Sequence, residues 1–344
     1  MSQGGERVAV VLFNLGGPDG PADVRPFLTN LFSDPAIIGL PTPARLPLAA
    51  LIAWMRERMA TANYAAMGGG SPLLGETRRQ AEALETALTE AGLQAKVFIA
   101  MRYWSPTIDE AVRAVAAFGP SDIVLAPLYP QFSTTTTGSS LKAWQGAYGG
   151  PAAVHTLCCW HDNRGLVEAH AEAIGEVWEK AGRPKVRLLF SAHGIPVRTA
   201  ERGDPYAWQV QSTCRAIAAR LGAGWDWKLC YQSRVGPLKW LGPSTSEAIA
   251  EAAAEGLGVL IDPVSFVSEH VETLIELDRD YAALARRAGV PCYLRAPALG
   301  AHPVFIAGLA GAVLGTLERA GVQPDGEACP LNFARCVRTR EIAA

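Results

Sequence analysis

Short runs of aliphatic and β-branched residues recur along the chain and constrain the fold more than any other feature of the sequence. The clearest are RVAVVLFNLGG (7–17), KVFIAMRYW (96–104), DIVLAPLYP (122–130), KVRLLFSAHGIP (185–196), WKLCYQSR (227–234), GVLIDPVSF (258–266) and PCYLRAPAL (291–299). Their nearly continuous hydrophobicity is typical of strands buried on both faces of a parallel sheet. Helical patterns such as ETRRQAEALETALTEAG (76–92) lie between them. This alternation predicts a doubly wound α/β architecture.

An internal similarity indicates that such a unit occurs twice. Residues 102–130 resemble residues 234–266, with Pro106 matching Pro243 and Glu110-Ala111 matching Glu247-Ala248. Both segments have the pattern of a strand, a turn, a helix and a strand, which predicts two similar domains. Because ligands of such sheets bind outside the carboxyl ends of the strands, residues at those ends are the first candidates for function.

Composition and charge exclude several classes of protein. Of the 344 residues, 49% are hydrophobic and 19% are charged, as in folded globular proteins. The net charge of -2 provides no basic surface for nucleic acid, which is therefore not an expected partner. The N-terminal stretch MSQGGERVAVV does not resemble a secretion signal, so a cytoplasmic location is expected.

The stretch SFVSEHVETLIELDRDY (265–281) places Glu272, Glu276 and Asp280 at intervals of four residues. On an α-helix they share one side, and this pattern alone favours an ordinary solvated face. Two observations favour a functional interpretation: the helix would begin directly after a strand, and His270 stands next to acids that can bind metal. From the residues alone, both interpretations remain open.

His193 is a second candidate, because it directly follows a buried strand in LLFSAHGIP (188–196). An isolated histidine is about as often structural as functional, but a position at a strand end favours function. One histidine with a group of carboxylates supplies a base, proton acceptors and ligands for a divalent metal.

Two loops are candidate sites for anions. The Ser/Thr cluster STTTTGSS (133–140) offers hydroxyl and backbone donors, although a polar loop before a helix explains it equally well. The segment NLGGPDG (14–20) follows a strand but lacks the G-x-G-x-x-G pattern and the lysine of a P-loop, which excludes nucleotide binding there.

Together, these motifs resemble those of the ferrochelatase family from about Val8 to about Gly315. The resemblance is carried by FNLGGPDGPADVRPFLTNLF (13–32), MGGGSPL (67–73), RYWSPTIDEAV (102–112), LYPQFSTTTTGSS (128–140), FSAHGIP (190–196), RGDPY (202–206), YQSRVGPLKWLGP (231–243) and FVSEHVETLIELDRDY (266–281). It implies two similar Rossmann-like domains with parallel sheets and a porphyrin cleft between them. The implied boundaries are 1–150, with an apolar lip at 36–60, then 151–320, and a tail at 321–344.

The resemblance also implies an activity and roles for individual residues. The activity is insertion of Fe²⁺ into protoporphyrin IX with release of two protons, the last step of haem synthesis. His193 and Glu272 correspond to the catalytic residues that also meet the metal, and neutral His193 would suit proton removal at cellular pH. Glu276, Asp280 and His270 correspond to a path for protons and metal on a widened, π-type helix. Residues that correspond to the porphyrin-binding positions are Arg102, Tyr103, Ser133, Trp240, Arg56 and Leu15.

Other functions of the same fold remain as alternatives. A related chelatase could act on coproporphyrin or insert cobalt, although Glu272 at the position of a second histidine favours iron. A non-catalytic porphyrin or haem carrier would not need both His193 and Glu272. The sequence has no feature that fixes the oligomeric state.

The cysteines fit the family less closely. Some ferrochelatases hold a [2Fe-2S] cluster with one internal cysteine and three near the C-terminus. Here the candidates are Cys158, Cys159, Cys329 and Cys336, while Val337 and Arg338 stand where a third tail cysteine is expected. Neighbours on a strand point to opposite faces, so either a cluster or a set of idle thiols fits the sequence.

The apolar segment AIIGLPTPARLPLAALIAWM (36–55) could meet a membrane surface. It is shorter than the ~20 apolar residues of a membrane span and is interrupted by proline. Because protoporphyrin is largely apolar, the segment could dip into the interface at the inner face of the membrane, or it could serve only as a lid.

Overall fold

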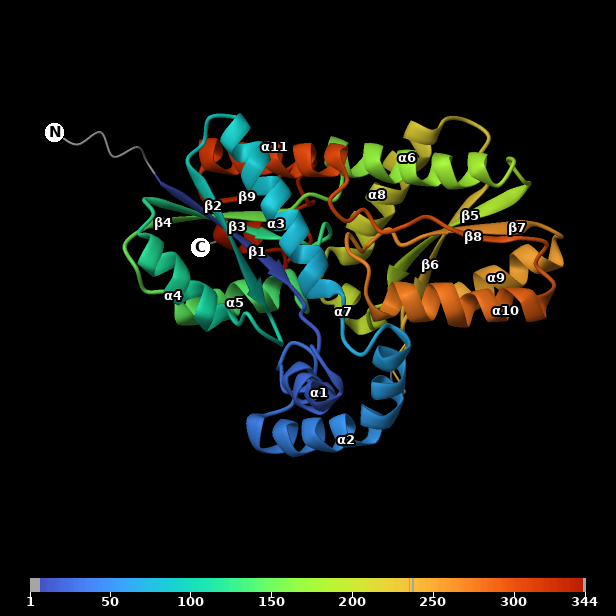
Figure 1. Ribbon diagram of the computed structural model, residues 1–344, viewed down its shortest axis with the longest axis horizontal. Helices are drawn as coiled ribbons and strands as arrows, with labels where there is room; N and C mark the ends of the chain where they lie inside the picture. Colours follow the sequence, from blue (N-terminus) through green and yellow to red (C-terminus); the bar gives the residue numbers. More distant parts are fainter. Residues whose placement is uncertain (1–6, 235, 237, 343–344) are drawn as a thin grey trace. The chain divides into compact units, whose positions relative to one another are not determined.

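A computed structural model describes residues 7–234, 236 and 238–342. The chain divides into two compact units. The first comprises residues up to 129, 133–158 and 313–323, and the second comprises 130–132, 159–312 and the residues from 324 onward. Each unit contains a parallel sheet, and the segments after residue 312 contribute to both units (Figure 1).

The sheet of the first unit has five strands in the order β2-β1-β3-β4-β9. These are β1 (Val8–Asn14), β2 (Ala95–Met101), β3 (Asp122–Pro127), β4 (Ala153–Cys159) and β9 (Val322–Pro324). β1 pairs in parallel with β2 and β3, and β3 with β4. All seven residues of β1 are buried, which explains why its sequence does not alternate between polar and apolar residues.

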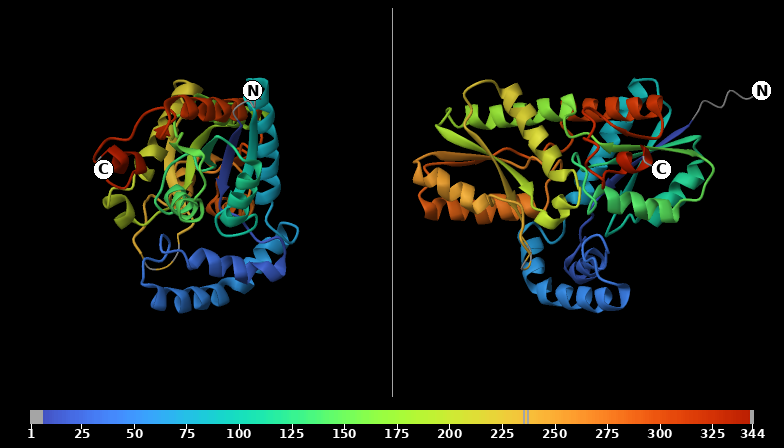
Figure 2. Two further views of the ribbon diagram at one scale, coloured as in Figure 1. Left: turned by 90° about the vertical axis from the view of Figure 1, so that its left-hand side faces the viewer. Right: turned by 180° about the vertical axis from the view of Figure 1, so that it is seen from behind.

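Helices of the first unit form two groups (Figures 1 and 2). α3 (Leu73–Glu90), α4 (Ile108–Phe118) and α5 (Thr137–Ala147) cover the sheet. A short 3-10 turn (Pro21–Asp23) leads into α1 (Val24–Phe32), which packs against the long helix α2 (Thr42–Ala66). α2 buries small residues such as Ala49 and Ala53, and its large exposed apolar side chains are Leu46, Leu51, Trp54, Met55 and Met59.

The sheet of the second unit has four strands in the order β6-β5-β7-β8, and its pairs are parallel. The strands are β5 (Val186–His193), β6 (Trp227–Gln232), β7 (Gly258–Asp262) and β8 (Tyr293–Arg295). The helices are α6 (Arg164–Lys180), α7 (Val197–Glu201), α8 (Tyr206–Leu221), α9 (Thr245–Ala254), a π-helix (Glu272–Tyr281), α10 (Ala282–Ala288), α11 (Pro303–Arg319), which ends in the first unit, and α12 (Val337–Ile342).

The central strand β5 contributes to a hydrophobic core on each face of this sheet. Leu188 and Phe190 belong to the core formed with α6 and α8. Leu189 belongs to the core formed with α9, α10 and the π-helix. Because successive side chains of a strand point to opposite faces, helices cover both sides of the sheet, and the predicted doubly wound α/β fold is confirmed.

The repeated sequence pattern corresponds to repeated structure. α4 begins with a capping box in which Thr107 accepts from the Glu110 amide at 3.2 Å and donates its own amide to the Glu110 carboxylate at 2.6 Å. α9 begins in the same way, with Ser244 and Glu247 at 3.3 Å and 2.6 Å. Each capped helix follows a strand and precedes another, which accounts for the similarity between the two halves of the sequence.

Candidate functional site

The site in the second unit begins where β5 and β6 end side by side, at His193 and Gln232. Three bonds fix His193: its amide donates to Ser265 Oγ at 3.0 Å, its carbonyl accepts from the Tyr206 hydroxyl at 3.0 Å, and its Nδ1 lies 2.6 Å from the Gly194 carbonyl. Since a carbonyl only accepts, Nδ1 carries a proton there, and Nε2 is the nitrogen that faces the rest of the site.

The Glu272 carboxylate lies between two histidines. Its Oε1 is 3.5 Å from His193 Nε2, and its Oε2 is 3.4 Å from His270 Nε2. Nδ1 of His270 donates to the Ser268 carbonyl at 3.1 Å, so both imidazoles have a backbone anchor on one nitrogen and the carboxylate on the other. The structure thus brings three of the predicted site residues into one group.

The charges of this group depend on one another. Burial would lower the pKa of His193, but the Glu272 carboxylate raises it to about 9, with smaller contributions from Glu276 and the Gly194 carbonyl. Burial would raise the pKa of Glu272, but His193 and His270 outweigh burial and lower it. The carboxylate 3.5 Å away therefore favours the protonated form of His193 in the substrate-free protein, and a neutral His193 during proton removal stays a prediction.

Glu276 lies next to this pair and has different partners. Its Oε2 accepts from Ser233 Oγ at 2.7 Å and from Gln232 Nε2 at 3.2 Å, and Gln232 also donates to the Glu272 carbonyl at 2.9 Å. Burial and the charge of Glu272 raise the pKa of Glu276, while Ser233, His193 and Gln232 oppose them. Glu272 therefore favours its ionised form, and Glu276 holds a proton more readily than an ordinary glutamate.

Asp280 is not part of the buried group. Its side chain is 52% exposed and pairs with Arg279 at 2.7 Å. The segment from Glu272 to Tyr281 is a π-helix, as the family resemblance implies, and π-helical segments often occur at functional sites. An interval of four residues does not distinguish this helix from an α-helix, so periodicity alone could not reveal it.

Two aromatic side chains border the histidines. Trp240 and Phe266 each stand edge-on to His193, with ring centroids 6.5 Å away, and Phe266 lies 4.7 Å from the ring of His270. A Cβ on Gly194 would lie 3.0 Å from the Gln232 carbonyl and 3.2 Å from the Trp240 ring, which explains the glycine after the histidine. The sequence pointed to Trp240 but not to Phe266.

A second group of predicted residues lies in the first unit, around Asp34. This buried carboxylate accepts from the Arg102 guanidinium at 2.7 Å and the Tyr103 hydroxyl at 2.8 Å, and the Ser139 hydroxyl also bonds to it. Arg102 Nε donates to Ser139 Oγ at 2.7 Å, and its guanidinium lies 4.9 Å from the Tyr103 ring centroid. The sequence pointed to Arg102 and Tyr103 but not to Asp34, which organises them.

The other predicted porphyrin residues of this unit do not join the Asp34 group through side chains. Ser133 is buried, and its hydroxyl bonds within its own loop. The carbonyl of Leu15 accepts from the Tyr103 amide at 3.0 Å, and the Arg56 guanidinium lies 5.8 Å from the Phe32 ring centroid. Their roles stay predictions.

Three of the four candidate cysteines lie together in the second unit. The thiols of Cys159 and Cys336 hydrogen-bond to Cys329, which also accepts from Gln209 Nε2 at 2.9 Å. These bonds lower the pKa of Cys329 to about 3. Cys158 is buried in the first unit. Across residues 7–234, 236 and 238–342, no group of three or more His, Cys, Asp or Glu side chains is arranged to hold a metal ion.

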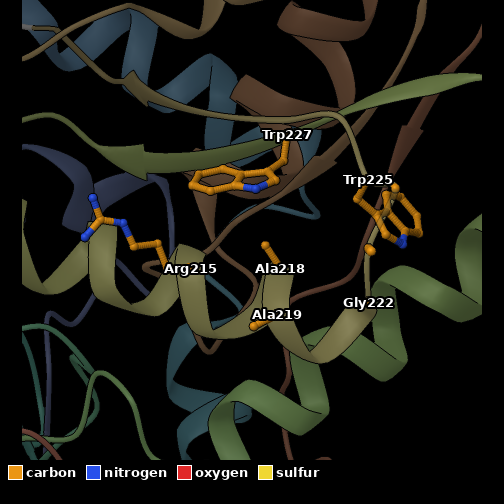
Figure 3. Close-up of a pocket in the computed structure, with 8 residues that line it drawn as sticks. Arg215, Ala218, Ala219, Gly222, Trp225 and Trp227 are labelled. Carbon is orange, nitrogen blue, oxygen red and sulfur yellow. The ribbon is translucent and has the colours of Figure 1, made fainter.

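Two surface pockets of the second unit contain none of the predicted catalytic residues. One, of about 340 Å³, lies at the start of β6, the opposite end of the strand from Gln232, and is lined by Trp225, Trp227 and residues of α8 (Figure 3). The other, of about 600 Å³, is lined by the beginnings of α6 and α11 together with Asp325.

Comparison with known proteins identifies the family of this chain. The ferrochelatase family model matches residues 7–317. The ferrochelatase of Phenylobacterium zucineum is 60% identical over 334 residues, covering 96% of this chain and 97% of the relative. That of Caulobacter vibrioides is 60% identical over 318 residues, covering 92% of each. That of Hyphomonas neptunium is 50% identical, covering 96% of this chain and 95% of the relative.

Comparison of structures agrees on the fold. SirB from Bacillus subtilis, solved with Fe³⁺, superimposes with a TM-score of 0.53 over 90% of this chain and 95% of SirB, at 13% identity. At that identity the similarity concerns the arrangement of strands and helices and not the activity. The family match and the identity to its members carry the functional conclusion: the chain belongs to the ferrochelatase family of haem biosynthesis.

Proposed function

We propose that this ferrochelatase inserts Fe²⁺ into protoporphyrin IX and that His193 and Glu272 remove the pyrrole protons. The observation that carries the residue assignment is the 3.5 Å pair of His193 Nε2 and Glu272 Oε1 at the carboxyl end of β5. The exposed apolar side chains of α2 support protoporphyrin over coproporphyrin, since protoporphyrin carries fewer propionates and favours an apolar surface. Coproporphyrin is the second candidate substrate.

The proton path follows from the charges of the group. In the substrate-free protein His193 is protonated at neutral pH and cannot accept a further proton. An arriving Fe²⁺ would disfavour the imidazolium, so His193 would pass its proton to Glu272 and onward to Glu276, whose raised pKa suits an acceptor. Glu276 would then release the proton to water by way of Asp280, whose side chain is 52% exposed, and so become free for the next one. Neutral Nε2 then takes a pyrrole proton, which leaves by the same route. A second cycle removes the other proton, and Fe²⁺ replaces both.

Porphyrin binding is proposed for the residues that match the family's porphyrin-binding positions. In the first unit, Arg102 and Tyr103 form a firm wall because Asp34 and Ser139 hold them. The other matching residues are Leu15, Ser133, Arg56 and Trp240. If this wall holds the porphyrin in a bent conformation, the pyrrole nitrogens turn out of the plane of the macrocycle, toward the metal ion and the base.

Replacing His193 by alanine should reduce iron insertion by about 10²–10⁴-fold, the usual contribution of a general base, while protoporphyrin still binds. Anaerobic assays with Fe²⁺ and either porphyrin measure turnover by absorbance, and fluorescence quenching measures porphyrin binding. The wild type should prefer protoporphyrin.

The matched control is His155→Ala, which removes a histidine paired with Asp122 at 2.9 Å in the first unit. It should keep turnover within about twofold. Normal turnover in His193→Ala would refute the base assignment. A wild type that binds porphyrin without inserting iron would be a carrier, and a preference for coproporphyrin would identify the second substrate.

The pKa of His193 should fall when its partner loses its charge. Since the Glu272 carboxylate raises that pKa to about 9 and burial opposes it, Glu272→Gln should bring the pKa of His193 below 7. NMR titration of protein labelled at histidine measures this, with the His193 resonance assigned by its loss in His193→Ala. A resonance that titrates near pH 6.5 in the wild type would show that the pair is not formed in solution.

The enzyme is proposed to bind the inner face of the membrane from the cytoplasm. No helix within residues 7–234, 236 and 238–342 is long and apolar enough to cross a membrane. α2 instead presents Leu51, Met55 and Met59 at intervals of four residues, each more than half exposed, with Trp54 beside them at 62%. Such an apolar stripe suits shallow insertion at the lipid interface.

Flotation with liposomes should show weak, reversible binding of the wild type. Leu51→Ser, Met55→Ser and Met59→Ser together should abolish it, because they remove the apolar stripe, while turnover with detergent-dispersed porphyrin is kept. Leu331→Ser, at a side chain 70% exposed in the second unit, is the control and should bind like the wild type. If the wild type does not float, α2 is only a lid.

A [2Fe-2S] cluster is proposed at Cys159, Cys329 and Cys336, with Cys158 as the fourth thiolate. The mutual bonds of the first three thiols and the low pKa of Cys329 support it, because the ligands of such a cluster are thiolates. When bound, the cluster would tie the C-terminal tail to the end of β4. No step of metal insertion depends on it.

Iron and sulfide analysis, with the visible spectrum of anaerobically purified protein, should detect the cluster. Cys336→Ser and Cys158→Ser should each remove it, since each takes away a ligand. Cys292→Ser, at the edge of the other sheet, should not. Wild-type protein without labile sulfide would exclude the cluster, and a cluster that survives Cys158→Ser would exclude that cysteine as a ligand.

A further inference from the structure

Arg295, the last residue of β8, binds two carboxylates that flank the catalytic segment. Its Nε and Nη2 donate to the two oxygens of Asp278 at 2.6 Å and 2.7 Å, and its Nη1 donates to Glu269 Oε1 at 2.6 Å. The side chain is only 14% exposed. Because the planar guanidinium binds both oxygens of the Asp278 carboxylate, it fixes the orientation of that carboxylate as well as its distance. The ammonium group of a lysine would fix only the distance.

The two partners lie on either side of the residues that carry the proposed chemistry. Glu269 directly precedes His270 and comes three residues before Glu272. Asp278 lies in the π-helix, two residues after Glu276. One guanidinium therefore holds the segment both before Glu272 and after Glu276.

Further bonds from the same region support this arrangement. Tyr293, two residues before Arg295 and on the same face of β8, donates its hydroxyl to the Leu277 carbonyl at 2.7 Å. The Ala298 amide donates to Glu269 Oε1 at 2.9 Å. Burial would raise the pKa of Glu269, but Arg295 outweighs burial and lowers it, so the ion pair persists at neutral pH.

Bonds near the start of the π-helix connect the segment held by Arg295 to His270. The His270 amide donates to Thr273 Oγ1 at 2.9 Å, and that hydroxyl donates back to the His270 carbonyl at 3.0 Å. His270 therefore follows any movement of the segment that Glu269 anchors. Because Glu272 lies 3.4 Å and 3.5 Å from its two histidines, a small shift would break both contacts.

We propose that Arg295 is a positioning residue for metal insertion, which holds the π-helix so that Glu272 stays between His193 and His270. The inference rests on the proposed roles of those residues. In this proposal β8 carries none of the reacting groups, but its last residue, Arg295, positions Glu272 and Glu276. Misplacing a reacting group by about 1 Å can reduce a rate by about 10²-fold.

A matched arginine in the same unit separates positioning from general stability. Arg187, near the start of β5, has a side chain 11% exposed and pairs with Asp226, Glu251 and Glu255. It is thus as buried and as well bonded as Arg295, but lies at the opposite end of the strand from His193. Loss of either arginine should destabilise the fold, and only loss of Arg295 should move the catalytic acids.

The test compares Arg295→Met, Arg295→Lys and Arg187→Met. Arg295→Met should lower kcat about tenfold or more with the Kd for protoporphyrin unchanged, and Arg295→Lys should lie between it and the wild type. Arg187→Met should lower Tm by a similar amount and keep kcat within about twofold. NMR titration of His193 should give a lower pKa in Arg295→Met, because Glu272 has moved away, and an unchanged pKa in Arg187→Met.

The NMR titration of His193 separates the proposed role of Arg295 from the proposed iron-insertion activity. If the wild type inserts no iron, the proposed activity fails, while the shift of the His193 pKa still decides whether Arg295 places Glu272. A folded Arg295→Met with wild-type kcat and His193 pKa, or an Arg187→Met with the same losses, overturns the inference. If Arg295→Met does not fold, Asp278→Asn takes its place: a lower kcat and a lower His193 pKa support the inference, and wild-type values of both overturn it.

Discussion

The Glu272 carboxylate, shared between His193 at 3.5 Å and His270 at 3.4 Å, is the interaction on which the rest of the site depends. A charge in this partly buried place is stable only when opposite charge and hydrogen bonds compensate the lost hydration. The two imidazoles provide that compensation. In return, the carboxylate raises the pKa of His193 and so favours its protonated form.

Placement of this pair follows from the parallel sheet of the second unit. β5 delivers His193 and β6 delivers Gln232 to the same edge, and the loop after β7 provides Ser265, which bonds the His193 amide. The hydrophobic cores on both faces hold these strand ends in place. A flexible loop could carry the same residues, but it could not hold a contact of 3.5 Å.

The sequence revealed the parts of this arrangement that leave a local pattern. Buried parallel strands are continuously apolar, so the strand ends, and His193 with them, could be located. Asp34 could not be found, because it follows a short helix and its partners Arg102 and Ser139 are 68 and 105 residues away. The contacts of Ser233, Phe266 and Arg295 with this segment are also distant in sequence, as is the carboxylate that raises the pKa of His193.

The π-helix has a consequence for how this segment can evolve. Its ten residues, Glu272 to Tyr281, wind more widely than an α-helix. Groups outside it hold both its start, where Gln232 donates to the Glu272 carbonyl, and its second half, where Arg295 donates to Asp278. A deletion of one residue would allow the ordinary, tighter helix to form, and would turn every side chain after the deletion to a new direction. The number of residues in this segment is therefore under as much constraint as their identity, and natural variation here should consist of substitutions, with insertions and deletions confined to the loops on either side.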